Sequence, residues 1–145
     1  MKVHHFRLAT LSRLREAVRD ERRKQLAETL GVADATTARR DELDGELEEL
    51  KRCRAAPAGT VDVERLLDAD RYEALLRLER GRVEQRRQAF ESEIEKRREA
   101  LLAADRDVRA LEHLADTHER RRLAEEDRRG MKELDEVAQR RQVVG

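Results

Sequence analysis

The chain has 145 residues, of which 46% are charged and only 2% aromatic, with a single proline. So few apolar side chains argue against a globular interior, and the composition is typical of long helices and coiled coils. The 33 basic residues balance the 33 acidic residues, which argues against a general nucleic-acid or anionic-membrane binder, since such proteins carry a clear excess of positive charge.

A disordered polyelectrolyte is the competing interpretation of this composition, because low hydrophobicity can leave a chain unfolded. Two features favour ordered helix. The formal net charge of zero removes the self-repulsion that expands disordered chains, and the apolar residues recur at helical spacing. We therefore expect an all-α fold.

The first helix is predicted over residues 5–53. Its apolar positions step by threes and fours along a single narrow seam. Arg22, Thr37 and Arg40 occupy places where that seam expects an apolar residue, so we expect the pairing of this helix to be weakest near Ala33 to Arg40. The seam residues are Leu11, Leu14, Val18, Leu26, Leu30, Ala33, Leu43, Leu47 and Leu50.

A turn is predicted over residues 54–61, where proline and glycine cluster. Pro57 removes a helix hydrogen bond and clashes with the preceding turn, so the first helix ends there. Thr60 or Asp62 can then cap the second helix by accepting hydrogen bonds from its free N–H groups.

The second helix is predicted over residues 62–141. Its seam alternates steps of three and four that sum to seven, which indicates a coiled-coil heptad. Farther along, Leu123, Met131, Leu134 and Val137 remain apolar, although their phase has slipped. Gly81 and Gly130 are candidate bend points, each costing roughly 1 kcal/mol relative to alanine. The seam residues are Leu76, Val83, Phe90, Ile94, Leu101, Ala104, Val108, Leu111 and Ala115.

Two long helices joined by a short turn should wrap on one another as an antiparallel coiled-coil hairpin, which we expect to form one domain over residues 1–145. The first helix should span roughly 70 Å and the second roughly 120 Å. Because these lengths do not match, the second helix is expected to overhang, leaving the chain after residue 115 without an intrachain partner. A helix with apolar residues in that position is better explained if another protein receives it.

Nothing in the sequence indicates catalysis. A two-helix hairpin has too little interior for a pocket, and no phosphate-binding loop, nucleophile elbow or Glu-x-x-His motif is present. His113 and His118 are five residues apart, on different helix faces, and the lone Cys53 is better explained as a small apolar filler than as a reactive thiol. We expect no enzyme activity, no cofactor and no metal.

The start of the chain has no apolar core long enough for a signal peptide, and no segment approaches the roughly 20 apolar residues that span a bilayer. We therefore expect a soluble cytoplasmic protein that does not insert into the membrane. The single cysteine excludes an intrachain disulfide.

The C-terminal third carries a family resemblance. Residues 111–114 (Leu-Glu-His-Leu), 119–122 (Glu-Arg-Arg-Arg) and 131–138 (Met-Lys-Glu-Leu-Asp-Glu-Val-Ala) resemble the C-terminal signature of the FliJ family of flagellar export proteins. Its most specific part is the ending read here as Asp135, Glu136 and Ala138. Length, a start with Phe6 and Leu8, the early turn and the long second helix agree with the family as well.

The resemblance implies a stalk-like coiled coil that inserts into the hexameric type III export ATPase and contacts the export gate and export chaperones. It would place the protein peripherally at the cytoplasmic face of the inner membrane. We assign ATPase contact to an apolar set and a basic set near the C-terminus: Leu111, Leu123, Met131, Leu134 and Val137, with Arg120, Arg121, Arg122, Arg128 and Lys132. For the gate, the family's face near the hairpin tip corresponds to Tyr72, Leu76 and Val83, with Glu79 departing from the family pattern.

Three other functions remain open. A homo-oligomeric scaffold would pair the seam beyond residue 115 with a second copy. A chaperone-like tentacle would hold clients at the hairpin tip, although Ala55 to Val63 offers little apolar surface for that. A basic-region DNA binder would bind duplex DNA with a steep salt dependence, which the balanced charge argues against. The sequence does not distinguish a motility apparatus from an injection apparatus.

Overall fold

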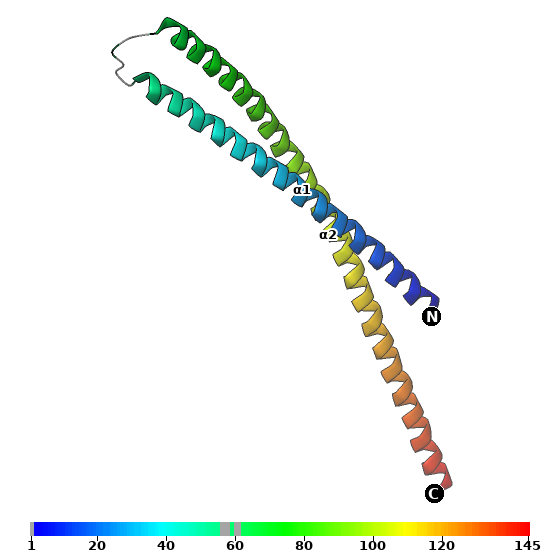
Figure 1. The fold of residues 1–145 in the computed structure, drawn as a ribbon. Coiled ribbons are helices and arrows are strands. Elements are labelled where there is room, and N and C mark those ends of the chain that lie inside the picture. The colour runs from blue at the N-terminus through cyan, green and yellow to red at the C-terminus, as the bar shows by residue number, and fades with distance from the viewer. Residues whose placement is uncertain (1, 56–58, 60–61) are drawn as a thin grey trace. The chain divides into compact units, whose positions relative to one another are not determined.

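The computed structural model describes residues 2–55, 59 and 62–145, with side chains for 8–55, 59 and 62–145. These residues form two helices and no strand: α1 spans Lys2–Ala55 and α2 spans Val63–Val144 (Figure 1). The predicted all-α hairpin with a longer second helix is therefore confirmed. The first helix extends beyond its predicted range of 5–53 at both ends, whereas the second begins one residue later and ends three residues later than the predicted 62–141.

Asp62 caps α2. Its side-chain oxygen accepts a hydrogen bond from the Glu64 backbone N–H at 3.1 Å, and its carbonyl accepts the first helical bond from the Leu66 N–H at 3.1 Å. This is the geometry of an N-cap residue, which satisfies N–H groups that the helix itself leaves without partners. Thr60, the other predicted cap, and Pro57 lie outside the described residues.

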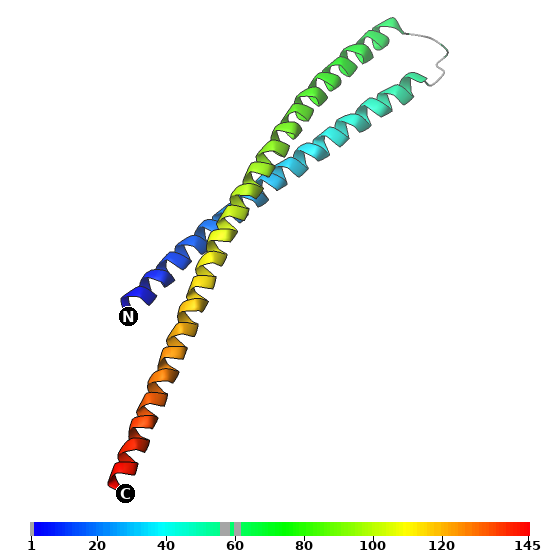
Figure 2. The same ribbon diagram turned by 180° about the vertical axis from the view of Figure 1, so that it is seen from behind.

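The chain divides into two compact units. The single domain expected over residues 1–145 stays a prediction. Unit 1 contains Met1–Asp20 and Leu102–Gly145, and unit 2 contains Glu21–Leu101. Within unit 2 the two helices run antiparallel (Figure 2), because residues later in α1 meet residues earlier in α2: Gln25 meets Arg97, whereas Arg39 meets Glu79. Each helix contributes one part to each unit.

The apolar core of unit 2 is small. Leu43 is completely buried and packs with Leu76 and Val83, with Leu47 partly buried beside them. Leu76 and Val83 are seven residues apart, so the interface position between them belongs to Arg80. The predicted seam of α2 is therefore wrong in one respect. Where its apolar residues are seven positions apart, the intervening interface position is not apolar.

Three partly buried arginines occupy those gaps: Arg80, Arg87 and Arg97. Long side chains can lie along an apolar surface while their charged ends reach water or an acidic partner. The Arg97 guanidinium, for example, bonds the Glu93 carboxylate at 2.9 Å and the Gln25 carbonyl at 3.3 Å. Arginine thus fills seam positions that a simple heptad reserves for apolar residues.

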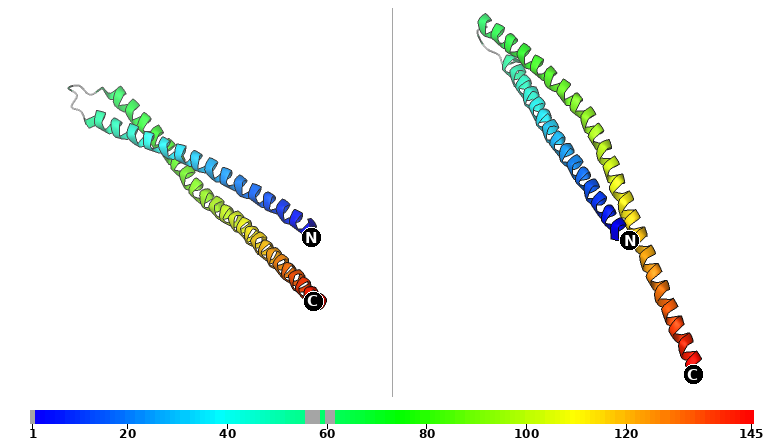
Figure 3. Two further views of the ribbon diagram at one scale, coloured as in Figure 1. Left: turned by 90° about the horizontal axis from the view of Figure 1, so that it is seen from below. Right: turned by 90° about the vertical axis from the view of Figure 1, so that its right-hand side faces the viewer.

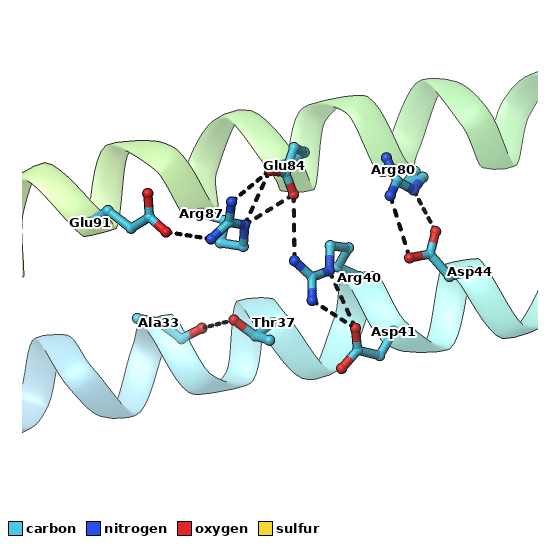
Figure 4. A network of polar contacts seen from close by, with 9 residues as sticks. All are labelled: Ala33, Thr37, Arg40, Asp41, Asp44, Arg80, Glu84, Arg87 and Glu91. Atoms are coloured by element: carbon cyan, nitrogen blue, oxygen red, sulfur yellow. Dashed lines mark hydrogen bonds and ion pairs between the residues drawn. The ribbon is translucent and has the colours of Figure 1, made fainter.

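Around the small core, ion pairs join the two helices, and we call this set the clasp. The arginine comes from α2 in some pairs and from α1 in others, as Figure 4 shows for Asp44 with Arg80 and for Arg40 with Glu84. Exposed pairs contribute little singly, so the clasp acts mainly by favouring one register of the helices. Its ion pairs are Arg39–Glu79, Arg40–Glu84, Asp44–Arg80, Arg54–Asp70 and Arg54–Glu73.

Acidification is expected to weaken the clasp. The hydrogen bond from Arg80 lowers the pKa of the Asp44 carboxyl below its ordinary value. A carboxyl whose pKa is lower in the folded state contributes stability above its unfolded pKa and loses that contribution as the pH falls through its folded pKa. The contribution should therefore be complete at neutral pH and decline below about pH 4.

Urea unfolding followed from neutral pH to about pH 3 tests this expectation. The unfolding midpoint of Asp44→Asn should fall less on acidification than that of the parent protein, because the variant has no Asp44 carboxyl to protonate. An equal fall in both proteins would contradict the assignment.

Unit 1 has its own buried contacts. Ala104 and Val108 of α2 are buried, and the Arg15 guanidinium pairs with Asp107 at 3.3 Å. Leu14, predicted to lie in the seam, is instead 60% exposed, so α1 offers little apolar cover here. Unit 1 holds 44 residues from the end of the chain, nearly all of them in α2, and only 20 from its start, and α2 continues well past the start of α1 (Figure 3).

Candidate partner-binding surfaces

The end of α2 in unit 1 is exposed along its length. Every described residue from His118 to Arg129 and from Met131 to Gly145 is exposed. Met131 and Leu134 show 70% and 71% of their surface to solvent, and Leu123 and Val137 are about half exposed as well. Four of the five predicted apolar ATPase contacts therefore lie on an uncovered helix, as expected from the unequal helix lengths.

Leu111, the fifth predicted apolar contact, differs from the other four. It is partly buried, one helical turn after the buried Val108. Residues three apart on a helix share a face, so Leu111 continues the intrachain seam of unit 1. Its side chain marks where that seam ends and the exposed end begins.

The basic residues of the exposed end fall into two groups. Arg122 is held within its own helix by Glu119 at 2.7 Å and Glu126 at 2.5 Å, and the hydrogen bond to Glu119 is the main cause that raises its pKa. The remaining four form no ion pair with any side chain in the described part of the chain, so their charges are available to an acidic partner. These four are Arg120, Arg121, Arg128 and Lys132.

The predicted gate residues divide between the surface and the core. Tyr72 is 50% exposed, and its hydroxyl donates a hydrogen bond at 3.1 Å to Glu46 of α1, which raises the Tyr72 pKa. Leu76 and Val83 are buried against Leu43, so their side chains hold the two helices together. Of the three, Tyr72 alone has the exposure that a direct contact requires.

A row of exposed apolar residues beside Tyr72 was missed in the sequence. Leu75 is 64% exposed and Leu78 55% exposed, and the steps of three from Tyr72 place all three side chains along one side of α2. We call Tyr72, Leu75 and Leu78 the outer row. The adjacent leucines 75 and 76 were the available signal, because neighbouring residues on a helix cannot both face the same partner.

Over residues 8–55, 59 and 62–145, no three His, Cys, Asp or Glu side chains come together as they would around a metal ion. Cys53 is a free, exposed thiol near the end of α1 rather than a packed filler.

Neither helix, over its described residues, contains an apolar stretch long enough to cross a membrane. In a comparison with protein families, the family model described as "FliJ: Flagellar FliJ protein" matches residues 4–143. Searches among curated proteins and among solved structures found no match. The family match includes nearly all of α1 and α2, and therefore both exposed surfaces.

Proposed function

Because the chain belongs to the FliJ family of flagellar export proteins, we propose that it is a coiled-coil stalk that binds the hexameric flagellar export ATPase and promotes its activity. The ATPase supplies the catalysis, and this chain supplies a helix that enters the ring. In this role the chain is a structural component of the export apparatus rather than an enzyme.

The exposed end of α2 is the observation that carries this proposal. It combines an uncovered helix with four exposed apolar side chains and four cations without an ion-pair partner among the described residues. Apolar anchors with basic residues around them fit a partner surface that is apolar at its centre and acidic at its rim. We propose that Leu123, Met131, Leu134 and Val137 are the anchors.

The outer row supports the second part of the proposal, contact with the cytoplasmic part of the export gate. Tyr72, Leu75 and Leu78 offer an aromatic ring and two leucines to a partner, and Tyr is favoured at protein interfaces. Contact with the gate would place the protein peripherally at the cytoplasmic face of the inner membrane. Export chaperones are further proposed partners.

The hydrolysis rate of the cognate export ATPase, measured with and without this protein, tests the proposal. A stalk should raise turnover and promote hexamer formation, while the protein alone should sediment as a monomer. A stable dimer that leaves ATP turnover unchanged would contradict it and favour the homo-oligomeric scaffold, in which the exposed end of α2 pairs with a second copy.

Loss of the outer row is expected to weaken gate binding at least tenfold. Tyr72→Ala with Leu75→Ala removes two exposed side chains of the kind that carry interface energy, each worth about 1–2 kcal/mol when it anchors a contact. Titration of the gate's cytoplasmic part measures the affinity. Leu102→Ala, which truncates an exposed leucine outside the row, is the matched control, and equal affinity for both variants would sink the assignment.

A further inference from the structure

Unit 2 has two parts that are held together differently. Residues 39–54 of α1 carry the clasp and the buried Leu43. Residues 24–37 of α1, which lie against the part of α2 around residues 87–98, have one polar contact across the helices among the described side chains, from Arg97 to the Gln25 carbonyl at 3.3 Å. We call residues 24–37 the loose section.

The loose section contains several residues that weaken a helix. Three threonine hydroxyls donate hydrogen bonds to carbonyls one turn earlier: Thr29 to Gln25 at 2.9 Å, Thr36 to Val32 at 2.8 Å and Thr37 to Ala33 at 3.1 Å. The last of these is drawn in Figure 4. Such bonds slightly destabilise and bend helices, because the hydroxyl competes for a carbonyl that the helix uses.

Gly31 lies among these threonines and adds to the effect. Glycine inside a helix costs roughly 1 kcal/mol relative to alanine. A Cβ at this position would meet nothing within 4 Å, so no close approach of another group requires glycine here. The residue therefore lowers the stability of the helix without improving its packing.

The loose section also packs less closely against α2 than residues 39–54 do. Thr29 is the buried residue of the section, so a hydroxyl lies there, whereas residues 39–54 bury Leu43. Across from it, Phe90 and Ile94 are only partly buried. A cleft of 220 Å³ lies between the helices where the section begins and includes Gln25 and Arg97 in its lining.

We propose that the loose section is a built-in opening point, at which α1 separates from α2 or unwinds locally while the clasp stays closed. The clasp keeps the hairpin in register, and the opening transiently uncovers the half-buried side chains of Leu26, Leu30, Phe90 and Ile94. The stalk would thus contain a compliant segment next to a rigid one. The proposal stands on contacts inside unit 2 and does not depend on the identity of any partner.

Amide hydrogen exchange of the full-length protein, read by mass spectrometry, tests the proposal. Local opening lets amides exchange without global unfolding, so the loose section should exchange faster than residues 39–54. Gly31→Ala should slow exchange in the loose section roughly fivefold and leave residues 39–54 unchanged.

Gly45→Ala is the matched control, because Gly45 lies among residues 39–54 and a Cβ there also meets nothing within 4 Å. It should leave exchange of the loose section unchanged. If both variants slow exchange equally in both sections, the amides exchange through unfolding of the whole hairpin and the proposal is wrong. Equal rates for the two sections in the parent protein would overturn it as well.

Discussion

Replacing Leu134 and Val137 with aspartate is expected to abolish stimulation of the export ATPase. Both side chains are exposed on the uncovered end of α2, at 71% and 50%. The free chain should therefore tolerate the change, whereas the complex would have to bury two new carboxylates. Desolvating an unpaired charge at an interface costs several kcal/mol, which is enough to reduce binding by a factor of a thousand or more.

The control for this experiment is the pair Gln139→Asp and Gln142→Asp. It adds the same two charges to exposed positions on the same stretch of helix, but on a different face. Helix content, measured by circular dichroism, should be unchanged in both variants. ATPase turnover should fall to its basal rate with the first variant alone, and full stimulation by that variant would remove these residues from the interface.

Replacing Leu43 with alanine is expected to be the most damaging single change to the fold. Leu43 is completely buried and contacts both Leu76 and Val83, the two buried apolar residues of α2 in unit 2. Truncating a buried leucine typically costs about 2–5 kcal/mol, partly through the cavity left behind. Since small helical proteins have only about 5–15 kcal/mol of stability, thermal unfolding should shift to a clearly lower temperature.

Leu75→Ala provides the comparison within the same unit. Its side chain is 64% exposed, so the same truncation should change stability by less than about 0.5 kcal/mol. The two variants should therefore differ in what they change: Leu43→Ala should lower the stability of the fold, whereas Leu75→Ala should weaken gate binding. Equal unfolding temperatures for both variants would show that the core of unit 2 lies elsewhere.

The fold was predictable because it depends on features that are local in sequence. The sequence predicts that the first helix ends near the single proline, and α1 ends at Ala55; Asp62 caps the second helix, and apolar residues at helical spacing leave one face to cover. The lengths of the two helices then determine that α2 must extend past α1. Each step needs only composition, spacing and chain length.

The interior of the helix interface was less predictable, because an arginine can be either a solvated surface residue or a partly buried interface residue that reaches an acidic partner. Arg80 reads as a surface residue in the sequence, yet it lies between Leu76 and Val83 and reaches Asp44 of the other helix. Thr29 was missed in the same way, since its hydroxyl is satisfied by its own helix and can be buried. Both depend on partners that spacing alone does not identify.

The candidate surfaces were predicted to different extents. The exposed end of α2 follows from helix length, so Leu134 and Val137 were identified correctly as exposed apolar residues. At the other surface, Leu76 was chosen where Leu75 is the exposed leucine. Assigning one of two neighbouring leucines to the surface requires the phase of the helix to within one residue, and arginines at the seam positions obscured that phase.

The mass of the complex between this protein and its export ATPase, determined by sedimentation in the presence of nucleotide, tests the proposed stalk role. A stalk predicts that the protein alone is a monomer and that a single chain sediments with an ATPase hexamer. A protein that forms a stable dimer by itself and does not sediment with the ATPase would contradict the stalk role.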